Sequence, residues 1–111
     1  MSVTSRTTDD GVVVVAVEGQ LIVGNRQELK NMVHEALERG GRKFVIDCSR
    51  TGYIDSSGLG ALVSMSRKVR ESGGELRIAG LNEDLRSLFE LTKLDTLFPI
   101  LATPEQALAG F

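Results

Sequence analysis

The architecture of this chain turns on one short stretch, Tyr53-Ile54-Asp55-Ser56-Ser57-Gly58-Leu59-Gly60. It follows an apolar run and leads into a segment whose apolar residues, among them Leu59, Leu62 and Val69, recur at helical spacing. A helix therefore begins inside the stretch, where Asp55 or Ser56 can cap it by accepting a hydrogen bond from a free amide of the first turn. Those amides and the helix dipole also favour an anion, such as a phosphate carried by a serine.

Length, charge and composition narrow the classes of function. The 111 residues fit one compact domain, expected to span residues 1–111. A net charge of −2 and the absence of tryptophan argue against nucleic acid, a membrane surface or stacked bases as direct partners. The single cysteine, Cys48, and the single histidine, His34, exclude an internal disulfide and a zinc site, and no cofactor is expected. The chain shows neither a signal-peptide pattern nor an apolar run of membrane-spanning length, which predicts a cytoplasmic protein.

The rest of the chain alternates short apolar runs with amphipathic segments. We expect an edge strand over residues 3–8, a turn at Asp9-Asp10-Gly11, and a central strand over residues 12–17. Residues 19–24 are expected to form a loop, and Asn25 to cap a first helix that ends at Gly40. A buried strand at residues 44–46 then leads to the serine stretch and the second helix.

The C-terminal third continues the alternation. A strand at residues 76–78 is followed by a helix capped by Asn82, a last strand at residues 97–101, and a short helix opened by Thr103 and Pro104. Pro99 cannot donate to a sheet, so the last strand belongs at an edge. The predicted order is ββαβαβαβα. It corresponds to a single α/β domain with a mixed, mostly parallel five-stranded sheet, an antiparallel N-terminal edge hairpin and about four helices.

Three interpretations of the serine stretch follow from its residues. The plainest is helix capping, but Gly58 and Gly60 weaken a helix by roughly 1 kcal/mol each, which suggests that something approaches the backbone closely. A nucleotide site is a second interpretation, although Val63 stands where the third glycine of the dinucleotide fingerprint belongs. A serine nucleophile is the third. It lacks a base, because His34 is expected on the solvent side of the first helix, so we do not expect an enzyme.

The stretch Ile54-Asp55-Ser56-Ser57-Gly58-Leu59-Gly60 resembles the signature of the STAS domain of bacterial anti-sigma factor antagonists. Similar features occur along nearly the whole chain. They are the turn Gly19-Gln20-Leu21, the strand entry Gly73-Gly74-Glu75-Leu76, and the helix segment Leu88-Phe89-Glu90-Leu91-Thr92. The resemblance implies a mixed sheet flanked by helices, in agreement with the predicted order.

The resemblance also implies a phosphoswitch in signal transduction, such as a stress response. In the family, the serine after the aspartate, here Ser56, is phosphorylated by a partner that is an anti-sigma factor or a related serine kinase of the histidine-kinase-like ATPase fold. The unphosphorylated form binds that kinase and frees a sigma factor or another client. The phosphorylated form does not bind, and a PP2C-type phosphatase restores it. The partner-binding surface is then expected to comprise Tyr53, Asp55, Ser56, Ser57, Gly58, Leu59, Ile22 and Asn25.

Two positions depart from the family pattern. Ile22 stands where the family usually has aspartate, and Asn25 where threonine is frequent. The aspartate is commonly part of the partner surface, so the departure bears on the choice of partner. The alternatives are a STAS module that binds a small ligand or nucleotide at this corner, and a transporter-associated scaffold without a phosphoswitch. Ser57 is a second possible acceptor of phosphate, and the oligomeric state is left open.

Overall fold

The computed structural model describes residues 2–111. The strands are β1 (Ser2–Thr7), β2 (Val12–Leu21), β3 (Lys43–Asp47), β4 (Thr51–Ile54), β5 (Glu75–Ala79) and β6 (Ile100–Leu101). The helices are α1 (Arg26–Glu38), α2 (Ser56–Glu71), α3 (Glu83–Leu91) and α4 (Pro104–Ala109), with a 3₁₀ turn η1 (Leu94–Thr96) after α3. The α/β class, the N-terminal hairpin and the four helices agree with the expectation from the sequence.

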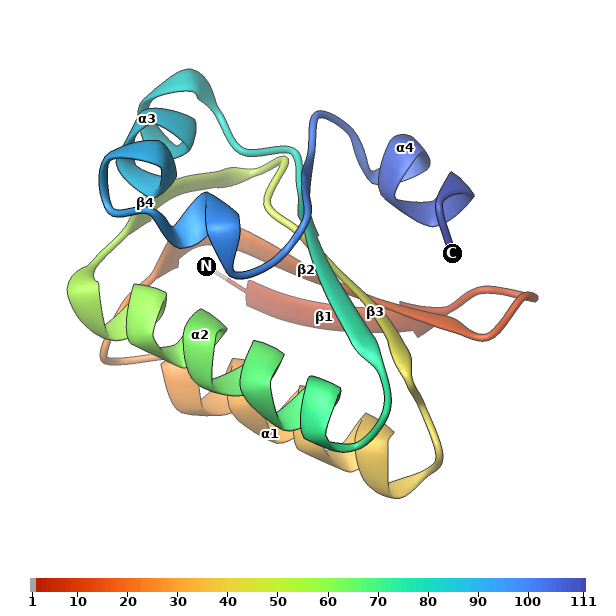
Figure 1. The fold of residues 1–111 in the computed structure, drawn as a ribbon. Coiled ribbons are helices and arrows are strands. Elements are labelled where there is room, and N and C mark those ends of the chain that lie inside the picture. Colours follow the sequence, from red (N-terminus) through yellow and green to blue (C-terminus); the bar gives the residue numbers. More distant parts are fainter. Residues whose placement is uncertain (1) are drawn as a thin grey trace.

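The sheet has the order β1-β2-β3-β5-β6, and β2 is its longest strand. β1 pairs with β2 antiparallel, whereas the other pairs are parallel. The first half of β2 pairs with β3, and its last residues pair with β4, so that Leu21 lies opposite Ile54. Figure 1 shows β4 diverging from β3 toward the end of the molecule where α2 begins. The serine corner, which follows β4, therefore lies beside the C-terminal end of β2.

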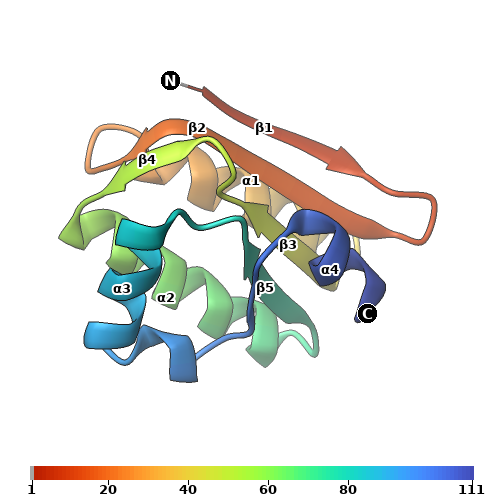
Figure 2. The ribbon, with the colours of Figure 1, turned by 90° about the horizontal axis from the view of Figure 1, so that it is seen from above.

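The two faces of the sheet are covered by different helices. α1 and α2 lie side by side under one face, and α4 lies on the other, close to β3 (Figures 1 and 2). Along β2, Val13 and Val15 join the large core beneath α1 and α2, while Val12 and Val14 join a smaller cluster that includes Ala107 of α4. Because both faces are covered, the strand is apolar throughout instead of alternating.

Three details of the predicted order were wrong. Within residues 2–111 the sheet has six strands, because Thr51–Ile54 forms β4. The expected loop at residues 19–24 begins three residues late, since β2 continues through Gly19 to Leu21 in order to pair with β4. The expected strand at residues 97–101 is reduced to Ile100–Leu101 by η1 and Pro99, although it lies at the sheet edge as predicted.

Candidate functional site

The serine stretch forms a sharp corner between β4 and α2. Ile54, the last residue of β4, is buried, and the next amide, of Asp55, donates to the carbonyl of Leu21 at 3.1 Å. α2 starts immediately afterwards at Ser56. The corner is thus anchored to the ends of two neighbouring parallel strands, which fixes the direction in which α2 leaves the sheet.

Asp55 organises this corner and is the N-cap of α2, a role that the sequence left open between Asp55 and Ser56. Its Oδ1 accepts from the amide of Gly58 and from the hydroxyl of Ser57, both at 2.7 Å, and its Oδ2 accepts from the amide of Val23 at 3.3 Å. The Ser57 hydroxyl, and then the Gly58 amide, hold the pKa of this carboxyl below its usual value. Asp55 is therefore a fixed negative charge beside Ser56.

The two serines differ in their surroundings. The Ser57 hydroxyl donates to Asp55 and its residue is half-buried. Ser56 is exposed, and within residues 2–111 its hydroxyl has no hydrogen-bond partner. As the first residue of α2, it also stands at the positive end of a sixteen-residue helix. Of the two hydroxyls, only that of Ser56 is free to react without breaking a bond of the corner.

Gly58 and Gly60 differ in whether the fold leaves room for a side chain. A Cβ at Gly58 would overlap with the carbonyl oxygen of Leu21 and come within 2.9 Å of Cγ2 of Ile54. The close approach inferred from the sequence is thus made by the chain itself, where α2 crosses the end of β2, and not by a ligand. At Gly60 a Cβ would meet nothing within 4 Å, because the residue faces solvent. The fold does not require glycine there.

The loop between β2 and α1 completes the corner. Ile22 is half-buried, Val23 is 66% exposed, and the Val23 amide is bonded to Asp55. Asn25 is the N-cap residue of α1, as predicted, but its side chain makes no capping hydrogen bond. The residue is buried, and its side chain turns back to accept from the Ile22 amide at 2.8 Å and to donate to the Gln20 carbonyl at 2.7 Å. These two bonds hold the loop in place.

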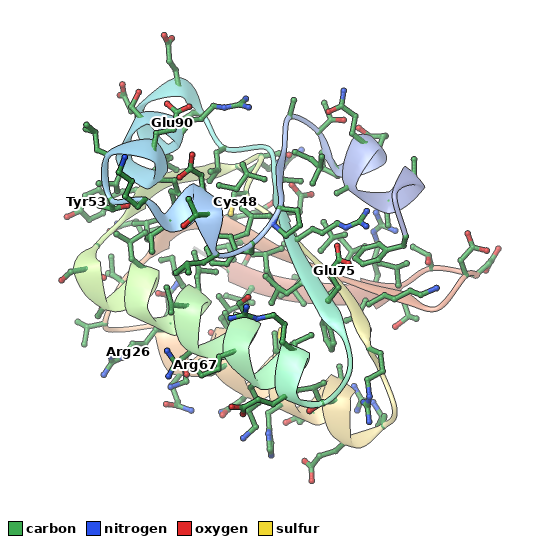
Figure 3. The ribbon with its side chains drawn as sticks, in the orientation of Figure 1. Arg26, Cys48, Tyr53, Arg67, Glu75 and Glu90 are labelled. Atoms are coloured by element: carbon green, nitrogen blue, oxygen red, sulfur yellow. The ribbon has the colours of Figure 1, made fainter. Side chains whose placement is uncertain are left out.

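Tyr53 and Leu59 flank the corner on either side. Tyr53 is 55% exposed on β4 and lies at the α3 end of the molecule, on the same side as Glu90 (Figure 3). Leu59 is half-buried against the main core, and its amide donates to the Asp55 carbonyl at 3.0 Å. The structure therefore gathers most of the predicted surface, with Tyr53, Ser56 and the neighbouring Val23 exposed and Gly58 and Asn25 inside. Sequence reasoning missed the bond from Val23 to Asp55, because it joins two segments far apart in the chain.

The remaining reactive side chains lie away from the corner. His34 is exposed on α1, 3.5 Å from a carboxylate oxygen of Glu38, as expected of a surface residue. Cys48 is buried, and desolvation raises the pKa of its thiol to about 12. Among the described residues no group of three or more His, Cys, Asp or Glu side chains is arranged to hold a metal ion. No helix among them is long and apolar enough to cross a membrane.

Comparisons with known proteins place this geometry in a family. The family model for the STAS domain matches residues 4–107, nearly the whole chain. The chain belongs to the STAS domain family.

Several relatives of this STAS domain carry functional names. "Putative anti-sigma factor antagonist BtrV" of Bordetella bronchiseptica is 28% identical, and the match covers 92% of this chain and 88% of that protein. The anti-sigma-B factor antagonist of Staphylococcus aureus is 31% identical over 85% of this chain and 87% of its own length. The crystal structure of a "putative anti-sigma factor antagonist" from Thermotoga maritima superposes with a TM-score of 0.89 at 28% identity. The match covers 97% of this chain and 92% of the other.

Proposed function

We propose that this STAS domain is a cytoplasmic, non-enzymatic anti-sigma factor antagonist, and that phosphorylation of Ser56 switches off its binding to an anti-sigma factor. The names of its relatives support the general function. The observation that carries the switch is the contrast between the two serines. Ser56 is exposed without a hydrogen-bond partner in the described chain, while Ser57 is bonded to Asp55.

The physical basis of the switch is local. A phosphate on Ser56 adds about −1.5 to −2 charges at neutral pH, next to the ionised Asp55. In the free protein, Ser56 is exposed to water and stands at the positive end of the α2 dipole, so the charge is accommodated and the fold is kept. In a docked complex the same charge is crowded and desolvated. A penalty of about 3 kcal/mol weakens binding more than a hundredfold.

The proposed partner is an anti-sigma factor that is itself a serine kinase of the histidine-kinase-like ATPase fold, with a PP2C-type phosphatase to reverse the reaction. ATP then belongs to the kinase and not to this chain. The kinase docks on the surface formed by Tyr53, Val23 and Ser56, with the half-buried Ile22 at its edge. An apolar Ile22, where the family usually has aspartate, favours a partner with an apolar contact at that point.

The alternative of a nucleotide at the corner has lost its main support. Gly58 suggested that a ligand approaches the backbone closely, but the space beside its Cα is occupied by Leu21 and Ile54. The loop amide of Val23 and the helix amide of Gly58, which an anionic ligand would use, both donate to Asp55. No observation favours this second function over the phosphoswitch.

Phosphate transfer tests the acceptor directly. The chain, Ser56→Ala and Ser57→Ala are incubated with ATP and each candidate kinase of that fold encoded in the same genome, and the products are weighed by intact-mass spectrometry. We expect one added phosphate on the unchanged chain and on Ser57→Ala, and none on Ser56→Ala. Labelling that persisted in Ser56→Ala would overturn the assignment.

Calorimetric titration tests the consequence of the charge. The kinase that labels Ser56 is titrated with the unphosphorylated chain, with Ser56→Asp and with Ser56→Asn as the uncharged control. We expect Ser56→Asp to bind at least about tenfold more weakly than Ser56→Asn, since a carboxylate carries only part of the phosphate charge. Equal affinities of Ser56→Asp and Ser56→Asn for the kinase would refute the proposal that the charge of the phosphate weakens binding.

A further inference from the structure

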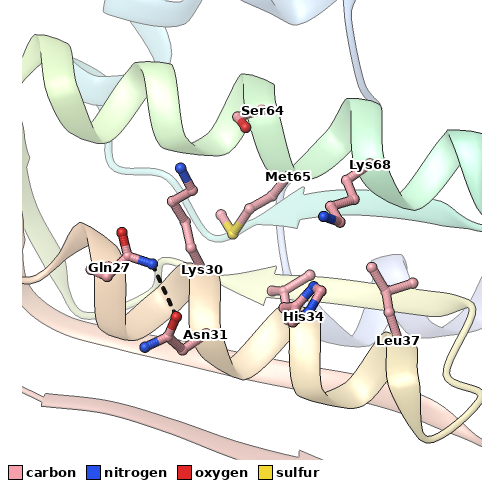
Figure 4. Close-up of a pocket in the computed structure, with 9 residues that line it drawn as sticks. Gln27, Lys30, Asn31, His34, Leu37, Ser64, Met65 and Lys68 are labelled. Atoms are coloured by element: carbon pink, nitrogen blue, oxygen red, sulfur yellow. Dashed lines mark hydrogen bonds between the residues drawn. The ribbon is translucent and has the colours of Figure 1, made fainter.

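A groove runs between α1 and α2 (Figure 4). Its volume is about 230 Å³, and its floor is apolar, formed by Val33, Leu37 and Met65. Lys30 extends from α1 toward α2, and Lys68 extends from α2 toward α1, with Met65 between them (Figure 4). The groove therefore combines an apolar base with a cation on each rim.

The charge of the groove contrasts with that of the whole chain. None of the residues that line it is acidic, although the chain has a net charge of −2. The last turns of α2 carry Arg67, Lys68 and Arg70 against the single carboxylate of Glu71. α1 carries Glu28, Glu35 and Glu38 outside the lining, and the carboxylate of Glu38 lies 3.5 Å from the lining residue His34. The groove is complementary to a ligand with negative charges around an apolar group.

The size of the groove selects among such ligands. Sites for small molecules usually enclose about 300–1,000 Å³ and bury most of the ligand, so this groove is below that range. It has room for an anchoring side chain of a larger partner. The groove lies further along α2 than the corner, since Ser64 on its rim is eight residues from Ser56, about 12 Å at 1.5 Å per residue. A protein docked at the corner can reach it with a neighbouring segment.

We propose that the groove between α1 and α2 binds an acidic segment of a partner protein, with one aliphatic side chain against Met65 and carboxylates beside Lys30 and Lys68. That this partner is the anti-sigma factor rests on the proposed function, whereas the groove contact itself does not. The contact lies outside the reach of Ser56, so the segment binds whether or not Ser56 carries a phosphate.

Peptide selection tests the chemistry of the occupant. A displayed library of random short peptides is selected against the full chain, and the enriched peptides are measured by fluorescence polarisation. We expect a consensus of one aliphatic residue flanked by Asp or Glu. We also expect affinity to fall at least about tenfold in the double variant Lys30→Glu/Lys68→Glu, since rim charges steer and hold an acidic partner. A consensus without acidic residues, or no enrichment at all, would overturn the proposal.

Controls separate the groove from general effects of charge and folding. Arg6→Glu/Lys43→Glu makes the same change in charge on exposed strand residues outside the groove and is expected to keep the peptide affinity. Ser64→Trp fills the groove from an exposed helix position without changing charge, and is expected to block the peptide. Peptide binding that survives both Ser64→Trp and the double reversal, with folding verified by circular dichroism, contradicts the proposal. So does self-association of the chain that the double reversal abolishes, since a second copy would then occupy the groove.

The two proposals fail separately. Ser56→Asp is expected to leave peptide affinity unchanged while it weakens the kinase complex. If kinase labelling of Ser56 succeeds but no acidic peptide binds the groove, only the groove proposal is wrong. If acidic peptides bind the groove but Ser56 is never labelled, the phosphoswitch is wrong and the groove stands.

Discussion

The hydroxyl of Ser57 donates to Oδ1 of Asp55 at 2.7 Å, and this bond separates the roles of two adjacent serines. Ser57 thereby holds Asp55, the N-cap of α2, whose Oδ1 also accepts from the Gly58 amide. The neighbouring Ser56 keeps an exposed hydroxyl. Under the proposed switch, this division lets Ser56 be modified without breaking the hydrogen bond that Ser57 makes to the cap of α2.

We expect Asp55→Asn to lower the thermal midpoint of unfolding at neutral pH, because the amide keeps the shape of the cap but loses its charge. The folded-state pKa of Asp55 is lowered from 3.8, so the charge stabilises the fold above that pH, and the contribution is lost as pH falls through the folded-state pKa. The difference in midpoint between the two proteins should therefore shrink below about pH 4. Thermal denaturation from about pH 2 to 8 measures this, with Asp95→Asn as the control. A difference that does not change with pH would contradict it.

How far the sequence predicts the fold depends on where each signal lies. The local spacing of apolar residues predicts the helices and the central strand. Asn82 and Thr103 cap α3 and α4 with their side chains, as expected. β4 has no such signal, because it is four residues long and two of them, Gly52 and Tyr53, are exposed. It becomes a strand only by pairing with the distant end of β2. The same pairing explains why β2 continues beyond its apolar run to Leu21.

The candidate site shows the same limit. Residue type predicted an acidic or hydroxylic cap at the start of α2, which Asp55 provides. It could not predict which serine is bonded, since that depends on the direction of two side chains. It also could not reveal that Gly58 contacts Leu21, because this contact depends on the crossing of α2 over β2. Only the family resemblance distinguishes Ser56 from Ser57 at the level of sequence.

Asn25 is the predicted N-cap residue of α1, but its side chain bonds the preceding loop instead of the helix. We expect Asn25→Asp to destabilise the fold by about 1–3 kcal/mol, because the buried donor to the Gln20 carbonyl is replaced by an oxygen that repels it. Urea denaturation measures the loss. Asn31→Asp, on the exposed side of α1, is the matched control and should change stability by less than about 0.5 kcal/mol. Equal effects at the two positions would refute the buried bond.

Cys48 is expected to resist alkylation in the folded protein. Its pKa of about 12 leaves almost no thiolate at pH 8, and the residue is buried. Reaction with a thiol reagent should be on the order of 10³-fold slower than in denaturant, where the thiol is exposed and its pKa is ordinary. Kinetics with a chromogenic disulfide in buffer and in concentrated urea measure the ratio. Comparable rates in the two solvents would show that this part of the core opens readily.

Gly58 and Gly60 provide a matched pair on one helix, with opposite expected effects. Gly58→Ala should cost about 1–3 kcal/mol of stability, because its methyl group overlaps with Leu21 and Ile54. Gly60→Ala should instead add about 0.5–1 kcal/mol, because the methyl meets open space and alanine favours the helix. Urea denaturation of both variants gives the signs, and a loss of stability in Gly60→Ala would contradict the geometry.

The same Gly60 variant also bears on the docking surface. Gly60 lies one helical turn after Ser56 on α2 and is exposed. If the kinase approaches the backbone there, Gly60→Ala should weaken the complex about tenfold or more although it stabilises the free protein. Calorimetry with the kinase, and with Ser64→Ala as a control one turn further along, separates the two effects. An unchanged affinity would place the edge of the docked surface between Ser56 and Gly60.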